Sequence, residues 1–476
     1  MNKKRKIVNI LVLSMSLSFM VGCGEGSSST SLTMSSDSAS TTSSSSTYPH
    51  TPDIESDLLE INYSNNSKIK NCADGVMLIS KKGDFSSVSS LKIAWGDSEG
   101  IFEDYSLIKE FDEFKSSDFE VEFSNNSLIP SLATKVWVTA YDASNKVISK
   151  ASLGMEDYKQ EQKIQYEFQV ISDEHVTNTS SAFYRRTKKS FEDIKEISPD
   201  SQVIVSNGDM VDEGKKANYE AFSNAYNSVY GSSSQEVLYG LGNHEFMYHS
   251  ESSDYSSVSS AELNNRYSSR LELWKEYTGN ESAYFSKVIN GSYFIFLGTT
   301  AMPNTLDGNT KADCTLGEKQ LAWFNETMEK AGKTNKPIYL FSHGSLRNTV
   351  SGSLTSLNQT WYGYSVNEEY KIRNIIKNYP QTLFFSSHSH WSFESQSPYV
   401  INDDYPSFFN TASVGYLWQG NGSGEHYQKG DYENGGGQGL FLEVYEDQIH
   451  IKGRQFEASD KTSKYWYSGY QVVLPM

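Results

Sequence analysis

The stretch LFFSSHSHWSF, residues 383–393, places two histidines directly after an apolar run that is typical of a buried strand. The run Leu383–Phe385 ends at two serines, and His388 and His390 follow with one serine between them. The whole chain contains only nine histidines, so a pair at one strand end is a distinctive feature. Two imidazoles on one loop can both turn inward, so they can act together at one site.

Four other apolar runs end in the same kind of residue. They are followed by DEH (173–175), GDMVD (208–212), GNHE (242–245) and His343. Helical patterns separate these runs, which predicts a layered α/β domain over residues 161–476, and the strand-like tail predicts a second sheet. Because ligands of α/β sheets gather beyond the carboxyl ends of the strands, we expect the five motifs to converge.

The residue types of the motifs favour a transition-metal site. Imidazole and carboxylate groups suit Zn, Mn or Fe. An aspartate can bridge two cations because it offers two oxygens, and an asparagine carbonyl adds a ligand without adding charge. A lone histidine after a strand is usually a satisfied polar group, but the full set of five motifs predicts a metal centre.

Taken together, the motifs resemble the calcineurin-like metallophosphoesterase superfamily. Its pattern is DxH, GDxxD, GNH(D/E), H and GHxH, and here the motifs read DEH, GDMVD, GNHE, FSHG and SHSH in that order. The resemblance spans residues 166 to about 395 and implies an αββα layered sandwich. Ser387 replaces the usual glycine before His388, at a position that shapes a loop and ligates nothing.

The resemblance also implies a role for each motif residue. Two divalent transition metal ions (Mn, Zn or Fe) would be held by Asp173, His175 and His390 on one side, by Asn243, His343 and His388 on the other, and by Asp209 as the bridge. His244 would act on the leaving group as an acid or a transition-state stabiliser, and Asp212 would orient it. Arg347 is a candidate phosphate clamp, and Glu245 receives no role.

Two positions distinguish branches of the superfamily. Purple acid phosphatases carry DxG in the first motif and a tyrosine ligand at the end of GDxxY, whereas this chain has His175 and Asp212 there. The resemblance therefore implies a divalent centre without a tyrosinate–iron charge-transfer band.

Residues 53–160 show short alternating apolar runs separated by turn-like clusters. This pattern predicts a small β-sandwich, immunoglobulin-like or fibronectin-like. The region holds no cluster of His, Asp or Cys, and it is either a binding module or a spacer. The two long polar loops at 246–263 and 416–439 are either specificity loops or surface insertions.

The N-terminus has the organisation of an export signal. A basic segment precedes a short apolar stretch that ends in FMVGC, which resembles the lipobox of bacterial lipoproteins. An ordinary signal peptide or a membrane anchor remains the alternative. We expect residues 1–23 to be a signal peptide with Cys23 as the lipidated residue, and residues 24–52, rich in Ser and Thr, to be a flexible tether. The protein is then expected on the extracytoplasmic face of a bacterial membrane.

Length and charge narrow the functional classes. A chain of 476 residues is too long for one ordinary domain, and a net charge of −18 argues against nucleic acid as a partner. Cys72 and Cys314 are expected to be structural thiols. His50, His249, His426 and His450 match no motif and are interpreted as surface or loop residues, although His249 and His426 lie in insertions that can reach the cleft.

The sequence thus predicts a lipid-anchored, metal-dependent phosphoesterase. It would hydrolyse phosphomonoesters or phosphodiesters with a hydroxide that bridges the metals. The alternatives are a surface binding lipoprotein that uses the same fold as a scaffold, or another metal-dependent hydrolase. A binding module has no need of the complete ligand set.

We expect Cys23→Ser to release the protein from the membrane or to leave it unprocessed, because the acceptor thiol is lost. Metabolic labelling with a palmitate analogue and fractionation of cells measure this. Unchanged lipid labelling of the variant would contradict the lipobox assignment.

Overall fold

The computed structural model describes most of the chain from residue 58 onward. The described ranges are 58–67, 71–102, 107–114, 118–130, 133–155, 163–231, 235–251, 257–303, 314–357, 366–420, 426–429, 437–456 and 465–476. The expected signal peptide, Cys23 and the tether lie outside them. Within these ranges, no helix has both the length and the apolar character needed to cross a membrane.

Seven strands make up the N-terminal region. They are β1 (Leu59–Tyr63), β2 (Cys72–Lys81), β3 (Ser90–Gly96), β4 (Leu107–Phe111), β5 (Asp118–Leu128), β6 (Lys135–Tyr141) and β7 (Val147–Gly154). They form two antiparallel sheets with the orders β1-β2-β5 and β4-β3-β6-β7. One apolar core draws residues from both sheets, such as Met77 of β2 and Val138 of β6. The region is therefore a β-sandwich.

The rest of the chain is built on two six-stranded sheets. The first has the order β10 (Val237–Gly240), β9 (Val203–Asn207), β8 (Tyr166–Ile171), β19 (Gln438–Val444), β20 (Gln448–Gln455) and β21 (Tyr465–Pro475). The second has the order β11 (Phe285–Ile289), β12 (Ser292–Leu297), β13 (Ile338–Ser342), β14 (Thr382–Ser386), β16 (Ser407–Asn410) and β15 (Tyr399–Val400). A separate hairpin joins β17 (Leu417–Gly420) and β18 (His426–Lys429).

Aromatic side chains fill the space between the two sheets. Alternate residues of β8 point inward, and the ring of Phe168 lies edge-on to Phe294 of β12 and Tyr339 of β13, with 4.8 Å between centroids in each case. This core also contains Phe341 and Phe385. Aromatic rings thus make up much of the core between the two sheets.

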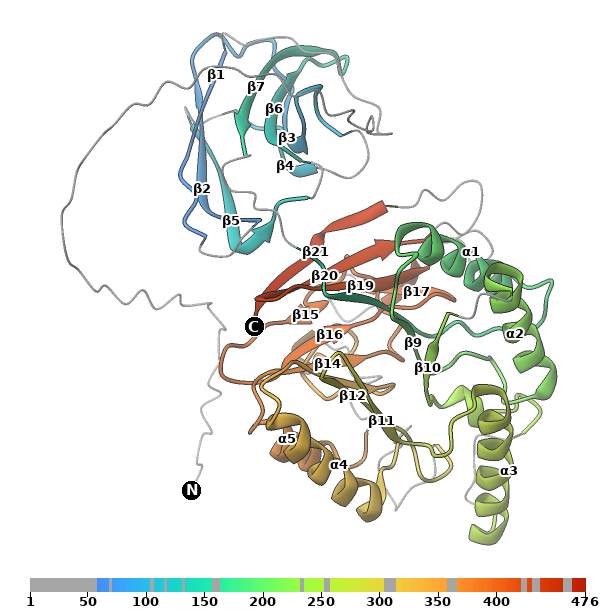
Figure 1. Ribbon diagram of the computed structural model, residues 1–476. Coiled ribbons are helices and arrows are strands. Elements are labelled where there is room, and N and C mark those ends of the chain that lie inside the picture. The colour runs from blue at the N-terminus through green and yellow to red at the C-terminus, as the bar shows by residue number, and fades with distance from the viewer. Residues whose placement is uncertain are drawn as a thin grey trace, which may run out of the picture. The chain divides into compact units, whose positions relative to one another are not determined.

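Helices cover the outer face of each sheet (Figure 1). The helices are α1 (Ala182–Ile197), α2 (Lys216–Tyr230), α3 (Ser260–Thr278), α4 (Gly317–Gly332) and α5 (Glu369–Ile376), with short 3-10 turns η2 (His244–Phe246) and η3 (Thr355–Leu357). The first three pack on the first sheet through residues such as Phe191 and Trp274. The last two pack on the second sheet through Phe324 and Ile372. The layers run helix, sheet, sheet, helix, as the family resemblance implies.

The parallel strands bring the motifs to one edge of the domain. β8, β9 and β10 are mutually parallel, and so are β12, β13, β14 and β16. Each motif begins within three residues of the end of β8, β9, β10, β13 or β14. The two sheets therefore present their carboxyl ends to a common space.

Three residues outside the motifs can be compared with their predicted surroundings. Cys72 and Cys314 are buried and form no disulfide, and burial raises the pKa of the Cys72 thiol to about 12. The expectation of a surface or loop position is wrong for His450. It is buried in β20 opposite Glu443, with 3.6 Å between its Nδ1 and the carboxylate.

Candidate metal centre

The backbone at the strand ends turns through the left-handed region. Asp173, His175, Asp209, His388 and His390 have φ values of 53°, 49°, 52°, 65° and 55°. Side-chain-bearing residues rarely adopt this conformation, and it concentrates at functional sites. These turns aim the five side chains back toward the carboxyl edge of the sheets, away from solvent.

Two glycines permit the loops to approach each other. A Cβ on Gly208 would lie 2.6 Å from Nδ1 of His343, and φ at this residue is +94°. A Cβ on Gly242 would collide with Oδ1 of Asp209 and lie 2.5 Å from its backbone nitrogen. The glycines of GDMVD and GNHE are therefore required by close packing of the loops.

One group of ligand-type atoms comes from the first, second and fifth motifs. Oδ1 of Asp173 lies 3.0 Å from Nε2 of His390, which lies 3.2 Å from Nε2 of His175. Asp209 completes this group, in which all the ligand-type atoms lie within 4.8 Å of one another.

A second group shares Asp209. Its Oδ2 lies 3.0 Å from Nε2 of His343, and Asp209, His343 and His388 again place one ligand-type atom each within 4.8 Å of the others. Asn243 precedes η2 and its side chain is buried. The structure thus gathers six of the seven residues that the resemblance assigns to the metals, and the role of Asn243 as the seventh stays a prediction.

Several buried atoms of this cluster have close neighbours but no hydrogen-bond partner. They are Oδ1 of Asp173, Oδ2 of Asp209, Oδ1 of Asn243 and Nε2 of His343. Three of these atoms lie about 3.0 Å from a ligand-type atom of another motif without an aligned hydrogen bond, and a buried polar group without a partner costs about 1–3 kcal/mol. Carboxylate, amide and imidazole atoms gathered in this way are suited to be ligands of a cation. The residues present therefore fit a metal site.

The electrostatics of the cluster also favour a cation. Burial alone would raise the pKa of Asp209, but the imidazoles of His343 and His244 hold it well below its usual value. Burial alone would lower the pKa of His343, yet Asp209 and Asp173 raise it to about 10. The two carboxylates thus favour positive charge at this point of the cluster. A bound cation would supply such charge.

Asp212 contacts three histidines, among them His244, which it is predicted to orient. The ring Nδ1 of His244 lies 2.8 Å from the backbone oxygen of Asp212 and 3.6 Å from its carboxylate. The carboxylate Oδ1 lies closer to Nδ1 of His175, at 3.3 Å, and Oδ2 lies 2.8 Å from Nε2 of His249. The backbone of Asp212 orients His244, while the side chain supports His175.

Glu245, for which the sequence offered no role, ties two motif loops together. Its Oε2 accepts hydrogen bonds from the backbone nitrogens of Asp209 (3.1 Å) and Gly242 (2.8 Å), and its Oε1 accepts one from Met210 (2.9 Å). Burial and the nearby Asp209 raise the pKa of this carboxyl to about 7. The acid that ends GNHE is a brace for the loop that carries Asp209.

Ser387, the departure from the family pattern, joins a buried chain of hydroxyl groups. Its Oγ accepts from Asn207 Nδ2 at 2.7 Å and lies 2.9 Å from Oγ1 of Thr411. Thr411 lies 3.0 Å from Oγ of Ser172, which donates to Oδ2 of Asp173 at 2.5 Å. The serine thus contributes to the network behind Asp173.

Tyr416 lies beside the cluster, although it belongs to none of the five sequence motifs. Its ring centroid lies 4.2 Å from that of His390 and 5.4 Å from that of His175. Gly415 donates to the backbone oxygen of Asp173 at 2.8 Å, which fixes the loop in this place. The first residue of the predicted loop 416–439 therefore lies beside the site. Residues 421–425 and 430–436 of that loop lie outside the described ranges.

Arg347, the candidate phosphate clamp, has contacts with α5. Its Nε is 3.9 Å from Oε2 of Glu369, and its backbone oxygen accepts from Arg373. Its role as a phosphate clamp stays a prediction.

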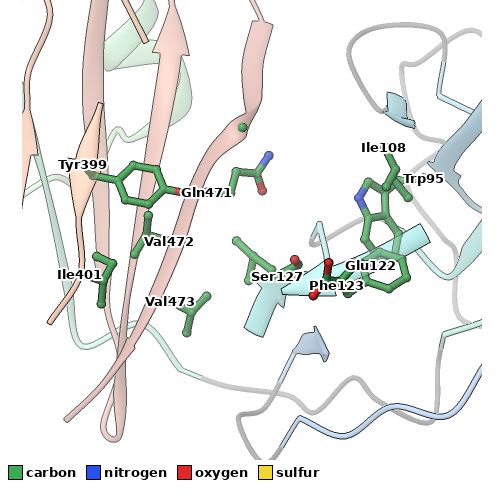
Figure 2. Close-up of a pocket in the computed structure, with 12 residues that line it drawn as sticks. Trp95, Ile108, Glu122, Phe123, Ser127, Tyr399, Ile401, Gln471, Val472 and Val473 are labelled. Atoms are coloured by element: carbon green, nitrogen blue, oxygen red, sulfur yellow. The ribbon is translucent and has the colours of Figure 1, made fainter. Parts of the chain in front are cut away.

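A pocket elsewhere in the molecule lacks the residue types of this chemistry (Figure 2). It is lined by Trp95, Ile108, Glu122, Phe123, Ser127, Leu128, Tyr399, Ile401, Gly469, Gln471, Val472 and Val473. No histidine, aspartate or cysteine is among these residues. The candidate site is therefore the cluster at the strand ends.

Comparisons with known proteins point to one family. The model of the calcineurin-like phosphoesterase family matches residues 167–392, and no curated protein matches the chain significantly. The crystal structure of a cold-active protein-tyrosine phosphatase of the psychrophile Shewanella sp. is 14% identical, covering 71% of this chain and 96% of that chain, with a TM-score of 0.28. A mutant of a cold-active protein tyrosine phosphatase is also 14% identical, covering 70% and 95%, with a TM-score of 0.27. Scores this low carry no argument about fold or substrate.

We expect Gly242→Ala to weaken metal binding by about 10-fold or more, in the range seen when the support of a metal ligand is removed. The added methyl group displaces Asp209, which both groups of ligand-type atoms share. Titration of metal-stripped protein with Mn²⁺ measures the effect. Gly469→Ala is the matched control, because a Cβ there has nothing within 4 Å. Equal Mn²⁺ affinity in Gly242→Ala and wild type would contradict the close-packing argument.

Proposed function

Residues 167–392 belong to the calcineurin-like phosphoesterase family, and on this premise we propose that the chain is a metal-dependent phosphoesterase. The observation that carries the proposal is the cluster of buried ligand-type atoms without hydrogen-bond partners. These atoms come from loops far apart in the sequence and converge on one centre. A binding scaffold gains nothing from such a cluster, whereas hydrolysis of a phosphate ester uses it directly.

We assign two divalent transition ions (Mn, Zn or Fe) to the two groups of side chains. Asp173, His175 and His390 would hold one ion and Asn243, His343 and His388 the other, with Asp209 between them. When bound, the ions would offset the negative charge of the phosphoryl oxygens and make water a stronger nucleophile. His175 and Asp212 stand where purple acid phosphatases have glycine and tyrosine, so the divalent branch is the better match.

His244 is the residue that we assign to the leaving group. Its Nδ1 donates to the backbone oxygen of Asp212, so Nε2 is the nitrogen left to face the substrate. Its ring lies 4.4 Å from that of His175, at the border of the cluster, and 18% of its side chain is exposed. In this place His244 can protonate the departing oxygen of a phosphomonoester or phosphodiester without serving as a ligand.

The placement of the protein in the cell is also part of the proposal. FMVGC at the N-terminus supports a lipid anchor at Cys23 on the extracytoplasmic face of a bacterial membrane. The N-terminal sandwich, with its sheets of three and four antiparallel strands, supports an immunoglobulin-like or fibronectin-like module. Such a module would hold the catalytic domain away from the membrane or bind a surface partner.

The proposed function is tested by turnover of p-nitrophenyl phosphate and bis-p-nitrophenyl phosphate by metal-stripped protein to which Mn, Zn or Fe is returned. We expect hydrolysis of at least one ester only after metal is returned. Asp209→Asn should lose activity with every metal, because both groups of ligands lose their shared carboxylate. Absence of turnover with every metal, or full activity of Asp209→Asn, would contradict the proposal.

His244→Ala in the same assay tests the proposed proton donor. We expect it to keep its metal and to lose about 10²–10⁴-fold in rate, the usual contribution of a general acid. The loss should be larger for an alkyl phosphate than for the nitrophenyl ester, because an alkoxide needs a proton as the bond breaks. Equal losses on both esters would remove the proton-donor role, and loss of metal would make His244 a ligand.

A further inference from the structure

His249 lies outside every motif, yet its imidazole reaches the candidate site. Its Nε2 lies 2.8 Å from Oδ2 of Asp212, and the two side chains are 55% and 22% exposed. Its ring centroid lies 6.5 Å from that of His244. The sequence places His249 in an insertion after GNHE, where it could equally have faced solvent.

The backbone around His249 is fixed to the second motif loop. Its backbone nitrogen donates to Oε1 of Glu213 at 2.7 Å. Gly214 donates to the backbone oxygen of Met247 at 3.2 Å and accepts from the hydroxyl of Tyr248 at 3.2 Å. These hydrogen bonds fix the backbone of residues 247–249 beside the second motif loop, so that the imidazole of His249 can reach Asp212.

Asp212 divides its two carboxylate oxygens between two histidines. Oδ2 contacts His249, while Oδ1 lies 3.3 Å from Nδ1 of the buried His175. The opposite nitrogen of His175, Nε2, faces Nε2 of His390 in the metal cluster at 3.2 Å. A carboxylate on the far nitrogen of a ligand imidazole fixes its tautomer and its orientation. A carboxylate held at one oxygen only can rotate away from that task.

We propose that His249 is a positioning residue of the metal centre. It holds Oδ2 of Asp212, so that Oδ1 remains on Nδ1 of His175 and Nε2 of His175 remains directed at the metal. The inference rests on the metal centre of the proposed function, but not on the reaction that the centre performs. It makes the exposed His249 part of the metal site, through hydrogen bonds that run from solvent to a buried ligand.

The test compares full-length variants by two independent readouts, Mn²⁺ affinity of stripped protein and ester turnover at saturating Mn²⁺. His249→Leu removes the hydrogen bond, and His249→Gln retains an N–H donor. Ser250→Ala is the matched control, because the neighbouring serine is exposed. We expect His249→Leu to bind Mn²⁺ about 10-fold more weakly, at the lower end of effects of outer-sphere partners. Glutamine should restore most of the affinity, and KM at saturating metal should change little.

A double variant tests whether His249 acts on metal binding through Asp212. If His249 acts through Asp212, His249→Leu should add little to the loss of Mn²⁺ affinity in Asp212→Asn, because both changes break one chain of contacts. Additive losses of Mn²⁺ affinity would show that His249 does not act through Asp212. Unchanged Mn²⁺ affinity in His249→Leu, or a defect in His249→Gln as large as that in His249→Leu, would overturn the proposal. A higher KM alone would do so as well, because it would make His249 a substrate contact.

The same measurements keep the two proposals apart. If wild type binds Mn²⁺ and His249→Leu weakens that binding while no ester is hydrolysed, the positioning role holds and the proposed function fails. If esters are hydrolysed and Mn²⁺ affinity does not depend on His249, the proposed function holds and the positioning role fails.

Discussion

Backbone hydrogen bonds between neighbouring motif loops are the interactions on which the site depends. Asp173 donates to the backbone oxygen of Gly208 and His175 to that of Asp209, each at 3.0 Å, and Ser387 donates to His343 at 3.0 Å. These bonds connect loops whose ligand residues adopt left-handed backbone, at a cost of about 1–3 kcal/mol for each residue. Such strain persists only when the surroundings fix it from several sides. The loops are therefore set by one another, and no single motif could hold its side chain in place.

The layered fold provides the frame for that mutual support. Parallel strands of two sheets end at the same edge, and an aromatic core between the sheets keeps those ends at a fixed separation. Glu245 accepts a hydrogen bond from the backbone of Asp209. The chain of hydroxyl groups that includes Ser387 ends in a hydrogen bond to Asp173. Packing, strain and buried charge thus together hold carboxylates and imidazoles close to one another, in an arrangement that fits a cation.

The sequence predicted the layers, the strand ends and the convergence of the motifs, because each depends on local periodicity and on strand direction. It could not predict contacts that depend on loop conformation. Asp212 holds His244 with its backbone oxygen, while its carboxylate lies 3.3 Å from His175 and 3.6 Å from His244. His450 was misplaced because its environment is a cross-strand pairing with Glu443. Ser387 and Tyr416 acquire their neighbours only when loops of both sheets meet at the common edge.

Anomalous diffraction from crystals of the Mn²⁺-loaded protein tests the central claim most directly. The account predicts two peaks about 3.5–4 Å apart, the usual spacing of two-metal sites, with Asp209 between them. His175 should be a ligand of the ion at one peak, and His343 should be a ligand of the ion at the other. No peak among these side chains, or Mn²⁺ bound only elsewhere on the protein, would contradict the assignment of a metal centre to the strand ends.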